Sequence, residues 1–169
     1  FHKLALEILK DHHIVKKIAN DDLLEYLVEE IFFSVPSPYF TKLFMDKNYL
    51  NNPLFIQYQN TIVRFIRLFI ANYYDSEGFD VLIRKAKKKD LPTLKIIKKI
   101  YQMYVLEKES SGMIDFDDMI YMATRIVEDK GIKKHYQYII VDEYQDTSLV
   151  REKLVQAIRN KTNAYVTVV

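Results

Sequence analysis

Residues 138–147 read Tyr-Ile-Ile-Val-Asp-Glu-Tyr-Gln-Asp-Thr, and this stretch decides how the end of the chain folds. Its first four residues are apolar or aromatic, and residues 139–141 are β-branched. A short run of this kind predicts a strand buried on both faces, as in a parallel sheet. Asp142 and Glu143 follow at once. Ligands of open α/β sheets bind outside the carboxyl ends of the strands, so we expect both carboxylates beside a crevice.

A magnesium-nucleotide site would use such a pair of carboxylates. It needs one carboxylate near the metal, and a second to orient or deprotonate the attacking water. The alternative is purely structural: the acidic run is a solvated turn, and Asp146, Thr147 or Ser148 caps the next helix. For an apolar run that ends in Asp-Glu alone, both interpretations stay open, because short motifs also occur by chance.

The chain ahead of this stretch is patterned for helices. Apolar residues recur at helical spacing in several segments, which we expect to be helical: 1–8 with a continuation to 18, 24–31, 62–73, 97–104 and 119–127. A short basic helix is expected over 79–89, and a loop or short helix over 42–50 after a break at 34–38. Capping signals stand at Asn20-Asp21-Asp22, Asn52-Pro53 and Asp115, and Gly131 marks a helix end.

The last third of the chain predicts a β-α-β unit: a strand from Tyr138, a helix over 150–158 and a strand over 164–169. Such a unit implies a parallel sheet with a right-handed crossover. Two strands do not make a stable sheet alone, so further strands would have to come from elsewhere. We therefore predict a mostly α chain, with an all-helical body followed by a β-α-β piece.

Composition narrows the function classes. The chain has 169 residues, of which 49% are hydrophobic, with 13 Tyr, 10 Phe and only 3 Gly, which favours a helical, folded chain. A net charge of +2 does not by itself indicate a nucleic-acid-binding protein. Such binding could be predicted only from local clusters of basic residues. Without Cys, disulfides and thiolate metal sites are excluded. No signal peptide or membrane-length apolar run is visible, and we expect a cytoplasmic protein. Both chain ends look cut from a longer protein.

Three segments together resemble the UvrD/Rep family of superfamily 1 DNA helicases. Residues 141–147, Val-Asp-Glu-Tyr-Gln-Asp-Thr, resemble that family's Walker B motif. Residues 1–5, Phe-His-Lys-Leu-Ala, are similar to the tail of a DNA-contacting motif. Residues 114–119, Ile-Asp-Phe-Asp-Asp-Met, look like a segment that precedes Walker B in the family, although Asp115 and Asp118 are sufficiently explained as helix-start residues.

The resemblance implies a role for each residue of the Walker B string. Asp142 would hold Mg²⁺, Glu143 would be the general base for the attacking water, and Gln145 would sense the γ-phosphate of ATP and couple it to the DNA path. Asp146 and Thr147 would support the turn and cap the following helix. Arg151 stands at a position where UvrD and Rep usually carry Gln. Helicase IV-like members resemble this chain more closely than UvrD and Rep do, both at this position and in residues 1–5, so the branch of the family stays open.

The resemblance also implies DNA contacts. Phe1 and His2 would lie near single-stranded DNA, with the aromatic ring stacking on a base; the alternative is an ordinary helix start with Phe1 in the core. The resemblance also implies contact with a duplex junction, because the helical accessory subdomain of the family can lie against duplex DNA. Eight basic residues could bind the phosphates of that duplex or simply form a solvated helix face: Arg84, Lys85, Lys87, Lys88, Lys89, Lys95, Lys98 and Lys99.

The implied function is that of an ATP-dependent DNA helicase or translocase, in which ATP hydrolysis drives movement on single-stranded DNA. Residues 1–112 would be a helical accessory subdomain, and 113–169 part of a RecA-like P-loop ATPase domain. No Gly-x-x-x-x-Gly-Lys-Ser/Thr occurs, so the rest of the same polypeptide would have to complete the ATPase site, and we expect this chain alone to be inactive.

Two rival functions remain open from the sequence. One is a stand-alone helical binding module in which the Walker-like string is only a capped turn. The other is a metal-dependent nuclease, which would use four carboxylates: Asp115, Asp117, Asp142 and Glu143. A nuclease of this kind requires these groups to converge around metal ions about 4 Å apart.

Overall fold

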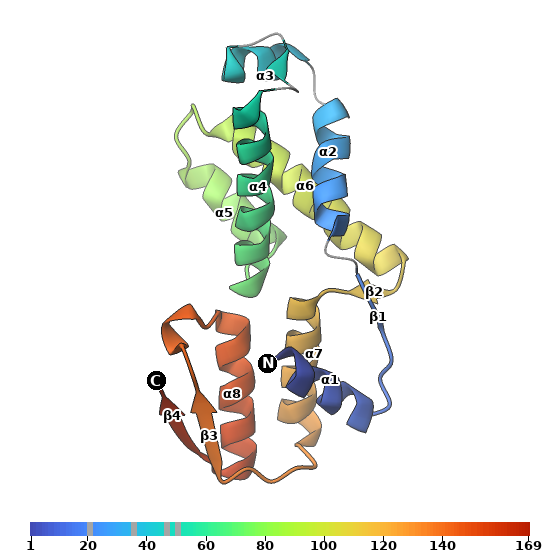
Figure 1. The fold of residues 1–169 in the computed structure, drawn as a ribbon, viewed down its shortest axis with the longest axis vertical. Coiled ribbons are helices and arrows are strands. Elements are labelled where there is room, and N and C mark those ends of the chain that lie inside the picture. The colour runs from blue at the N-terminus through green and yellow to red at the C-terminus, as the bar shows by residue number, and fades with distance from the viewer. Residues whose placement is uncertain (20–21, 35–36, 46–47, 50–51) are drawn as a thin grey trace. The chain divides into compact units, whose positions relative to one another are not determined.

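The computed structural model describes residues 1–19, 22–34, 37–45, 48–49 and 52–169 (Figure 1). Helices predominate in it. The elements in chain order are α1 (His2–Asp11), β1 (Lys17–Ile18), α2 (Asp22–Ser34), α3 (Ser37–Phe44), α4 (Pro53–Ala71), α5 (Ser76–Lys85), α6 (Leu91–Ser110), β2 (Met113–Ile114), α7 (Phe116–Lys130), β3 (Tyr138–Val141), the 3₁₀ turn η2 (Tyr144–Asp146), α8 (Leu149–Thr162) and β4 (Tyr165–Val168).

The chain packs as two compact units. Unit 1 comprises Phe1–Ile18, Ala71–Tyr73 and Gly112–Val169, and unit 2 comprises Ala19–Ile70 and Tyr74–Ser111. One junction between the units lies between Ser111 and Gly112, and Phe1–Ile18 belong to the same unit as the end of the chain. Whether these units correspond to an accessory subdomain and an ATPase domain stays a prediction.

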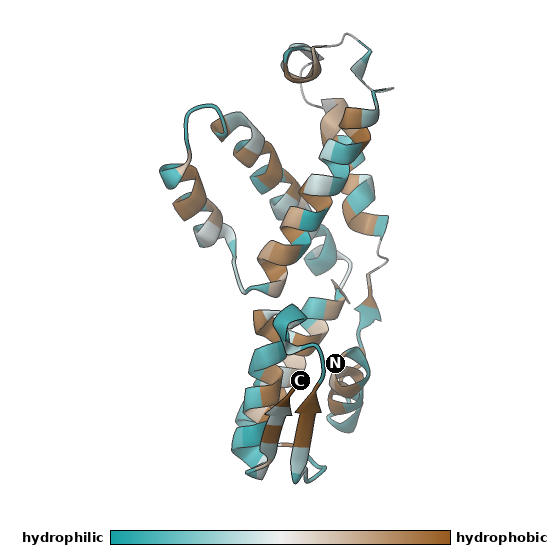
Figure 2. Cartoon of the chain, turned by 60° about the vertical axis from the view of Figure 1, so that its left-hand side comes forward, coloured by the Kyte–Doolittle hydropathy of each residue, from teal (hydrophilic) through white to brown (hydrophobic). Residues whose placement is uncertain are grey.

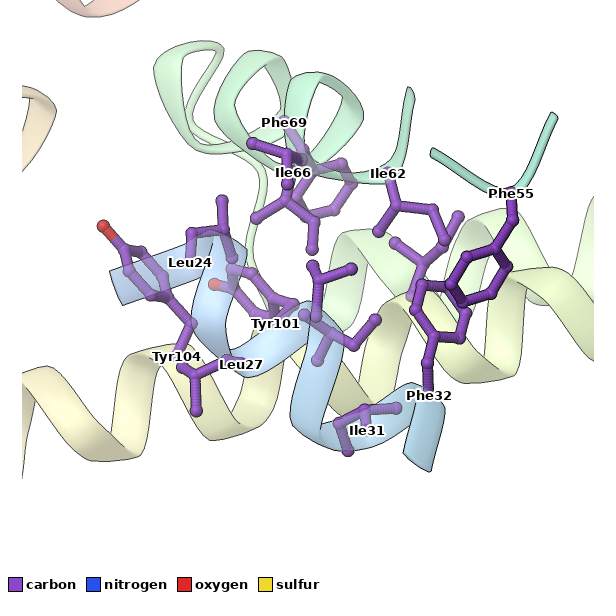
Figure 3. Close-up of a cluster of buried hydrophobic side chains, with 14 of the residues drawn as sticks. Leu24, Leu27, Ile31, Phe32, Phe55, Ile62, Ile66, Phe69, Tyr101 and Tyr104 are labelled. Atoms are coloured by element: carbon purple, nitrogen blue, oxygen red, sulfur yellow. The ribbon is translucent and has the colours of Figure 1, made fainter. Parts of the chain in front are cut away.

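Unit 2 is a helical body with a continuous aromatic and aliphatic core. Most of its buried side chains come from three helices that the apolar spacing predicts. Figure 3 shows ten of them interleaving: Leu24, Leu27, Ile31 and Phe32 of α2, Phe55, Ile62, Ile66 and Phe69 of α4, and Tyr101 and Tyr104 of α6. Phe79 of α5 packs on the Phe69 ring, with their centroids 4.1 Å apart. Burial of apolar area on this scale is what makes these helices stable together, since isolated helices of such length are marginal in water.

Unit 1 is built on α7. Helices α1 and α8 both pack against it, and the shared core contains residues of all three, including Leu9, Ile120, Ala123 and Leu154. Strands β3 and β4 pair in parallel, with Tyr138 opposite Tyr165 and Val141 opposite Val168, and α8 forms the connection between them. The parallel pairing expected from the sequence is thus present. In Figure 2 the apolar residues of these elements stand out as brown bands.

The expectation that β3 is buried on both faces is wrong. Val141 is buried and Ile139 packs on the α8 side, but Tyr138 and Ile140 are 69% and 73% exposed. Alternate residues of a strand point to opposite faces, and α8 covers one face only. Among the described residues, no element covers the face that carries Tyr138, Ile140 and Tyr165.

The expected continuation of the first helix to residue 18 is also wrong. Helix α1 ends at Asp11, and His13 adopts the left-handed conformation with φ 58°. The amides of His13 and Ile14 donate to the carbonyls of Lys10 and Leu9 at 3.0 and 2.9 Å, a Schellman arrangement that closes the helix. The chain then extends and pairs β1 with β2 in parallel.

Two further helices differ from the expected boundaries. Helix α3 starts at Ser37, inside the break expected at 34–38, because Pro38 fits a first helical turn, where its missing N–H costs no hydrogen bond. It includes residues 42–44 of the segment expected to be a loop or short helix, of which residues 46, 47 and 50 lie outside the described part of the chain. Helix α5 starts at Ser76, because the Asp75 carboxylate accepts hydrogen bonds from the Glu77 and Gly78 amides at 3.0 and 3.1 Å. It ends at Lys85 rather than at residue 89, which spares like charges from meeting at i, i+4 spacing.

Other sequence signals are confirmed. Asn52 Oδ1 accepts from the Leu54 amide at 2.9 Å, and α4 starts at Pro53. Gly131, with φ 82°, ends α7. Helix α4 runs from Pro53 to Ala71, so it includes most of the predicted 62–73 stripe and ends two residues before Tyr73. The cap expected at Asn20-Asp21 lies outside the described residues. In the described part of the chain, no helix is long and apolar enough to cross a membrane.

Candidate nucleotide and nucleic-acid site

The carboxylate pair Asp142–Glu143 lies on a turn fixed by backbone hydrogen bonds. The Val169 amide donates to the Val141 carbonyl at 3.0 Å, and the Tyr144 amide donates to the Val169 carbonyl at 3.1 Å. The turn after β3 is therefore bracketed by the end of β4. Figure 1 shows η2 at the end of the β3 arrow, directly before α8. Both carboxylates are exposed, at the carboxyl end of the parallel pair, as the sequence predicts.

Glu143 has a backbone conformation that is uncommon for a residue with a side chain. Its φ and ψ are 52° and 48°, in the left-handed region. The Asp142 carboxylate accepts a hydrogen bond from the Glu143 amide at 3.1 Å, and the Glu143 carbonyl accepts one from the Asp146 amide at 2.9 Å. Strained backbone of this kind persists only where neighbouring bonds hold it, and it is concentrated at functional sites.

The Glu143 carboxylate is oriented by a neighbour. Gln145 Nε2 donates a hydrogen bond to Glu143 Oε2. Glu143 and Asp142 are both exposed residues, and one oxygen of each accepts a hydrogen bond within the turn. The structure thus brings together the three side chains that the sequence singled out: Asp142, Glu143 and Gln145.

These oxygens suit a hard cation that keeps other ligands of its own. Mg²⁺ in nucleotide sites takes one or two protein carboxylates and completes its shell with water and phosphate oxygens. Among the described residues, no group of three or more His, Cys, Asp or Glu could hold a metal ion. The donor set at the turn therefore fits a shared Mg²⁺–phosphate site better than an all-protein cage.

Asp115 serves as the cap of α7. Its carboxylate accepts from the Asp118 amide at 2.8 Å, and the Asp118 carboxylate accepts from the Asp115 amide at 2.9 Å, which is a reciprocal capping box. Asp115 and Asp117 do not join Asp142 and Glu143 in any metal-binding group of the described residues. The nuclease alternative lacks the convergence of carboxylates that it requires.

Phe1 and His2 lie in the same unit as the carboxylate turn. The His2 ring stacks on Phe116, with centroids 4.7 Å apart and an interplanar angle of 24°. Phe1 is 40% exposed, so it is not the core residue that the structural alternative expects. The ring stack joins the starts of α1 and α7, two segments that the sequence analysis treated separately.

The basic residues lie in unit 2. Lys85 is the last residue of α5, and the turn before α6 carries Lys87, Lys88 and Lys89, all exposed. The Asp90 amide closes this turn on the Lys87 carbonyl at 2.9 Å. Lys98, by contrast, forms an ion pair with Asp80 at 2.5 Å. The exposed basic residues therefore lie on the end of α5, on this turn and on α6, rather than on one helix: Arg84, Lys85, Lys87, Lys88, Lys89, Lys95 and Lys99.

The sequence did not reveal that two polar groups at the start of α8 are buried. Ser148, one of the three expected cap residues, is the helix N-cap, but its side chain makes no capping bond. Its Oγ and the Arg151 Nε are buried without a hydrogen-bond partner. The Arg151 guanidinium lies over the Phe1 ring, 5.8 Å from its centroid. The i, i+3 spacing of Ser148 and Arg151 was the available signal that both share one helical face.

Unit 1 also contains a tyrosine cluster away from the turn. Tyr73 meets Tyr121 edge to face at 5.4 Å, and the Lys153 ammonium lies 3.9 Å from the Tyr73 ring centroid. Burial raises the pKa of Tyr73 to about 12, and the nearby Tyr121 and Glu128 add to the rise.

Comparison with known proteins identifies the family of the chain. The model of the UvrD/REP helicase N-terminal domain matches residues 1–169, so the chain belongs to that family. It is 31% identical over 70 residues to the ATP-dependent DNA helicase Rep of Buchnera aphidicola (38% of this chain, 10% of that protein). It is 30% identical over 74 residues to one chain of the ATP-dependent helicase/nuclease of Syntrophomonas wolfei (41% and 6%).

A longer match is with the RecB chain of the RecBCD enzyme of Buchnera aphidicola, at 27% identity over 180 residues, which covers 96% of this chain and 14% of that protein. The chain spans between 6% and 14% of the length of these three relatives.

Proposed function

We propose that this chain is part of an ATP-dependent DNA helicase or translocase, and that it supplies one side of an ATPase site together with a DNA-contacting segment. The observation that carries the proposal is the fixed turn after β3, which presents Asp142 and Glu143 side by side with Gln145 bonded to Glu143. The names of the relatives support ATP and DNA as its ligands. The rest of the same polypeptide would supply the phosphate loop.

Each residue of the turn has a distinct task in this proposal. Asp142 would hold Mg²⁺ through its exposed carboxylate, and the bound ion would neutralise charge on the phosphates. Glu143 would accept a proton from the attacking water at its Oε atoms. Gln145 would keep the Glu143 carboxylate oriented, and would move when its amide is drawn toward a γ-phosphate, which links the state of the nucleotide to the base.

DNA would be contacted at two places. In unit 1, Phe1 offers a partly exposed ring on which a base can stack, a contact worth about 1–3 kcal/mol per base. In unit 2, the exposed turn with Lys87, Lys88 and Lys89 would meet phosphates without reading sequence. In this proposal unit 2 is the helical accessory subdomain, and residues 113–169 belong to a RecA-like ATPase domain.

The test is ATP hydrolysis by the full-length polypeptide that contains this chain, with and without single-stranded DNA. Asp142→Ala should lower the DNA-stimulated rate by at least about 10²-fold, since metal stabilisation of a transition state is worth several kcal/mol. Asp129→Ala, at an exposed carboxylate of the same unit, is the matched control and should leave the rate unchanged.

The isolated chain should bind no more than weakly to ATP and should not hydrolyse it, because it lacks a phosphate-binding loop. DNA-stimulated turnover by the isolated chain that Asp142→Ala abolishes would overturn the proposal that the site is shared with the rest of the polypeptide. Full activity of Asp142→Ala in the full-length protein would overturn the role of the turn.

A further inference from the structure

Arg151 lies between the two functional segments of unit 1. Its guanidinium lies over the ring of Phe1, and its own helix starts directly after the carboxylate turn. The separation of 5.8 Å is close to the limit of about 6 Å at which a cation is still attracted to an aromatic face. A small displacement of Phe1 is therefore enough to make or break this contact.

Arg151 also lacks part of its hydrogen bonding. Its Nε is buried with no partner, and so is the Oγ of Ser148 one turn earlier on the same face of α8. Buried polar groups are nearly always paired, so an unpaired one in a native structure calls for an explanation. An arginine held by one marginal cation–π contact, with an unsatisfied Nε, is suited to take a second arrangement when its surroundings change.

The path from Arg151 to the carboxylates is short and rigid. The Arg151 amide donates to the Ser148 carbonyl at 3.1 Å, and the Thr147 amide donates to the Tyr144 carbonyl at 3.0 Å. The first turn of α8 and η2 thus form consecutive hydrogen-bonded turns. η2 includes Gln145, whose amide holds Glu143. Backbone hydrogen bonds therefore connect the residue that contacts Phe1 with the turn that contains Gln145.

We propose that Arg151 is a positioning residue that couples DNA engagement at Phe1 to the orientation of Glu143. The proposal rests on the function proposed above. A base that stacks on Phe1 moves its ring, the guanidinium follows, and the start of α8 carries the change to the Gln145–Glu143 pair. Coupling of this kind is reciprocal, so bound nucleotide changes DNA affinity by the same factor by which DNA changes nucleotide affinity.

The experiment measures the ratio of DNA-stimulated to basal ATP hydrolysis in the full-length helicase. Arg151→Gln should lower this ratio about fivefold or more, which is the lower end of typical coupling between sites, while basal turnover changes by less than about twofold. The effect of a non-hydrolysable ATP analogue on oligonucleotide affinity should shrink by the same factor. A purely structural role would change stability and basal turnover instead, without altering the ratio.

Matched variants identify the contact. Phe1→Leu should lower the ratio at least as much as Arg151→Gln, because it removes the stacking ring as well as the partner of the guanidinium. Adding Arg151→Gln to Phe1→Leu should cause no further loss, because the contact is then already absent. Arg151→Lys keeps a cation near the ring and should retain more stimulation than Arg151→Gln. Arg159→Gln, at an exposed arginine in the last turn of the same helix, should behave as wild type.

The outcomes separate this inference from the proposed function. If wild type is stimulated by DNA and Arg151→Gln keeps the full ratio, the coupling role of Arg151 is wrong and the ATPase site stands. If wild type hydrolyses no ATP in the presence of DNA, the proposed function fails and the coupling role falls with it. If Arg151→Gln does not fold, Arg151→Lys and Phe1→Leu decide: an unchanged ratio in both overturns the inference.

Discussion

The capping box of α7 gives a prediction whose size follows from the structure. Asp115→Ala removes the carboxylate that accepts a hydrogen bond from the Asp118 amide at 2.8 Å. The reciprocal bond, from the amide of residue 115 to the Asp118 carboxylate at 2.9 Å, should weaken with it. Loss of an N-cap costs about 1 kcal/mol of unfolding free energy, within a range of 0.5–2. The cost should lie in the upper half of that range, because α7 carries the core of unit 1 and both reciprocal bonds are part-buried.

The assay is urea denaturation followed by helical circular dichroism, with melting curves in parallel. Each kcal/mol of lost unfolding free energy should lower the melting temperature by roughly 2–4 °C in a chain of this size. Asp115→Asn is the matched control, because Asn caps helices as well as Asp does. It should keep both stability and any catalytic activity of the full-length protein. An unchanged stability in Asp115→Ala would refute the cap, and an inactive but stable Asp115→Asn would show that the carboxylate is functional.

Three other outcomes are expected. Ile66→Ala should cost about 2–5 kcal/mol of unfolding free energy, because Ile66 is 0% exposed, whereas Leu68→Ala at 54% exposure on the same helix should change it by less than about 0.5 in urea denaturation. Tyr73 has its pKa raised from 10.0 to about 12, so the unfolded chain ionises first and stability is lost as the pH rises from 10 toward 12; melting temperatures across that range should fall less steeply in Tyr73→Phe. Changing Lys87, Lys88 and Lys89 to Gln should make DNA affinity less dependent on salt. The slope of log affinity against log salt concentration should fall by roughly 0.7 to 0.9 for each phosphate contact that is lost, whereas an unchanged slope would mean that these lysines only form a solvated turn.

The sequence predicted the ends of helices best, because residues that cap a helix act through hydrogen bonds and backbone angles close to them in the sequence. Asp115 and Gly131 mark the two ends of α7, and Asn52 marks the start of α4, because capping depends on side chains and φ values close in sequence. The β-α-β order at the end of the chain was likewise predictable, since an apolar β-branched run, an amphipathic helix and a second apolar run each have their own period.

Features that depend on distant partners were not predictable. The pairing of β1 with β2 involves two residues in each strand, too few to leave a pattern. The exposure of Tyr138 and Ile140 reflects which layers surround the sheet, not the residues of β3. The left-handed Glu143 has no sequence signal either, because its conformation is imposed by bonds from β4 and η2.

The candidate site shows the same division. Its carboxylates were predictable from their place after a strand, whereas the position of Arg151 over Phe1 required the packing of α1 beside α8, which the sequence does not reveal.

The most direct test of the whole account is Glu143→Gln in the full-length polypeptide, compared with Asp142→Ala. Glu143→Gln keeps the shape of the turn but removes the basic carboxylate, so Mg²⁺-dependent ATP binding should persist while hydrolysis falls by about 10² to 10⁴-fold. DNA unwinding should fail with hydrolysis, and Asp142→Ala should in addition weaken Mg²⁺-dependent nucleotide binding. Near-normal ATP turnover in Glu143→Gln, or a loss of nucleotide binding as large as in Asp142→Ala, would contradict the roles assigned to this turn.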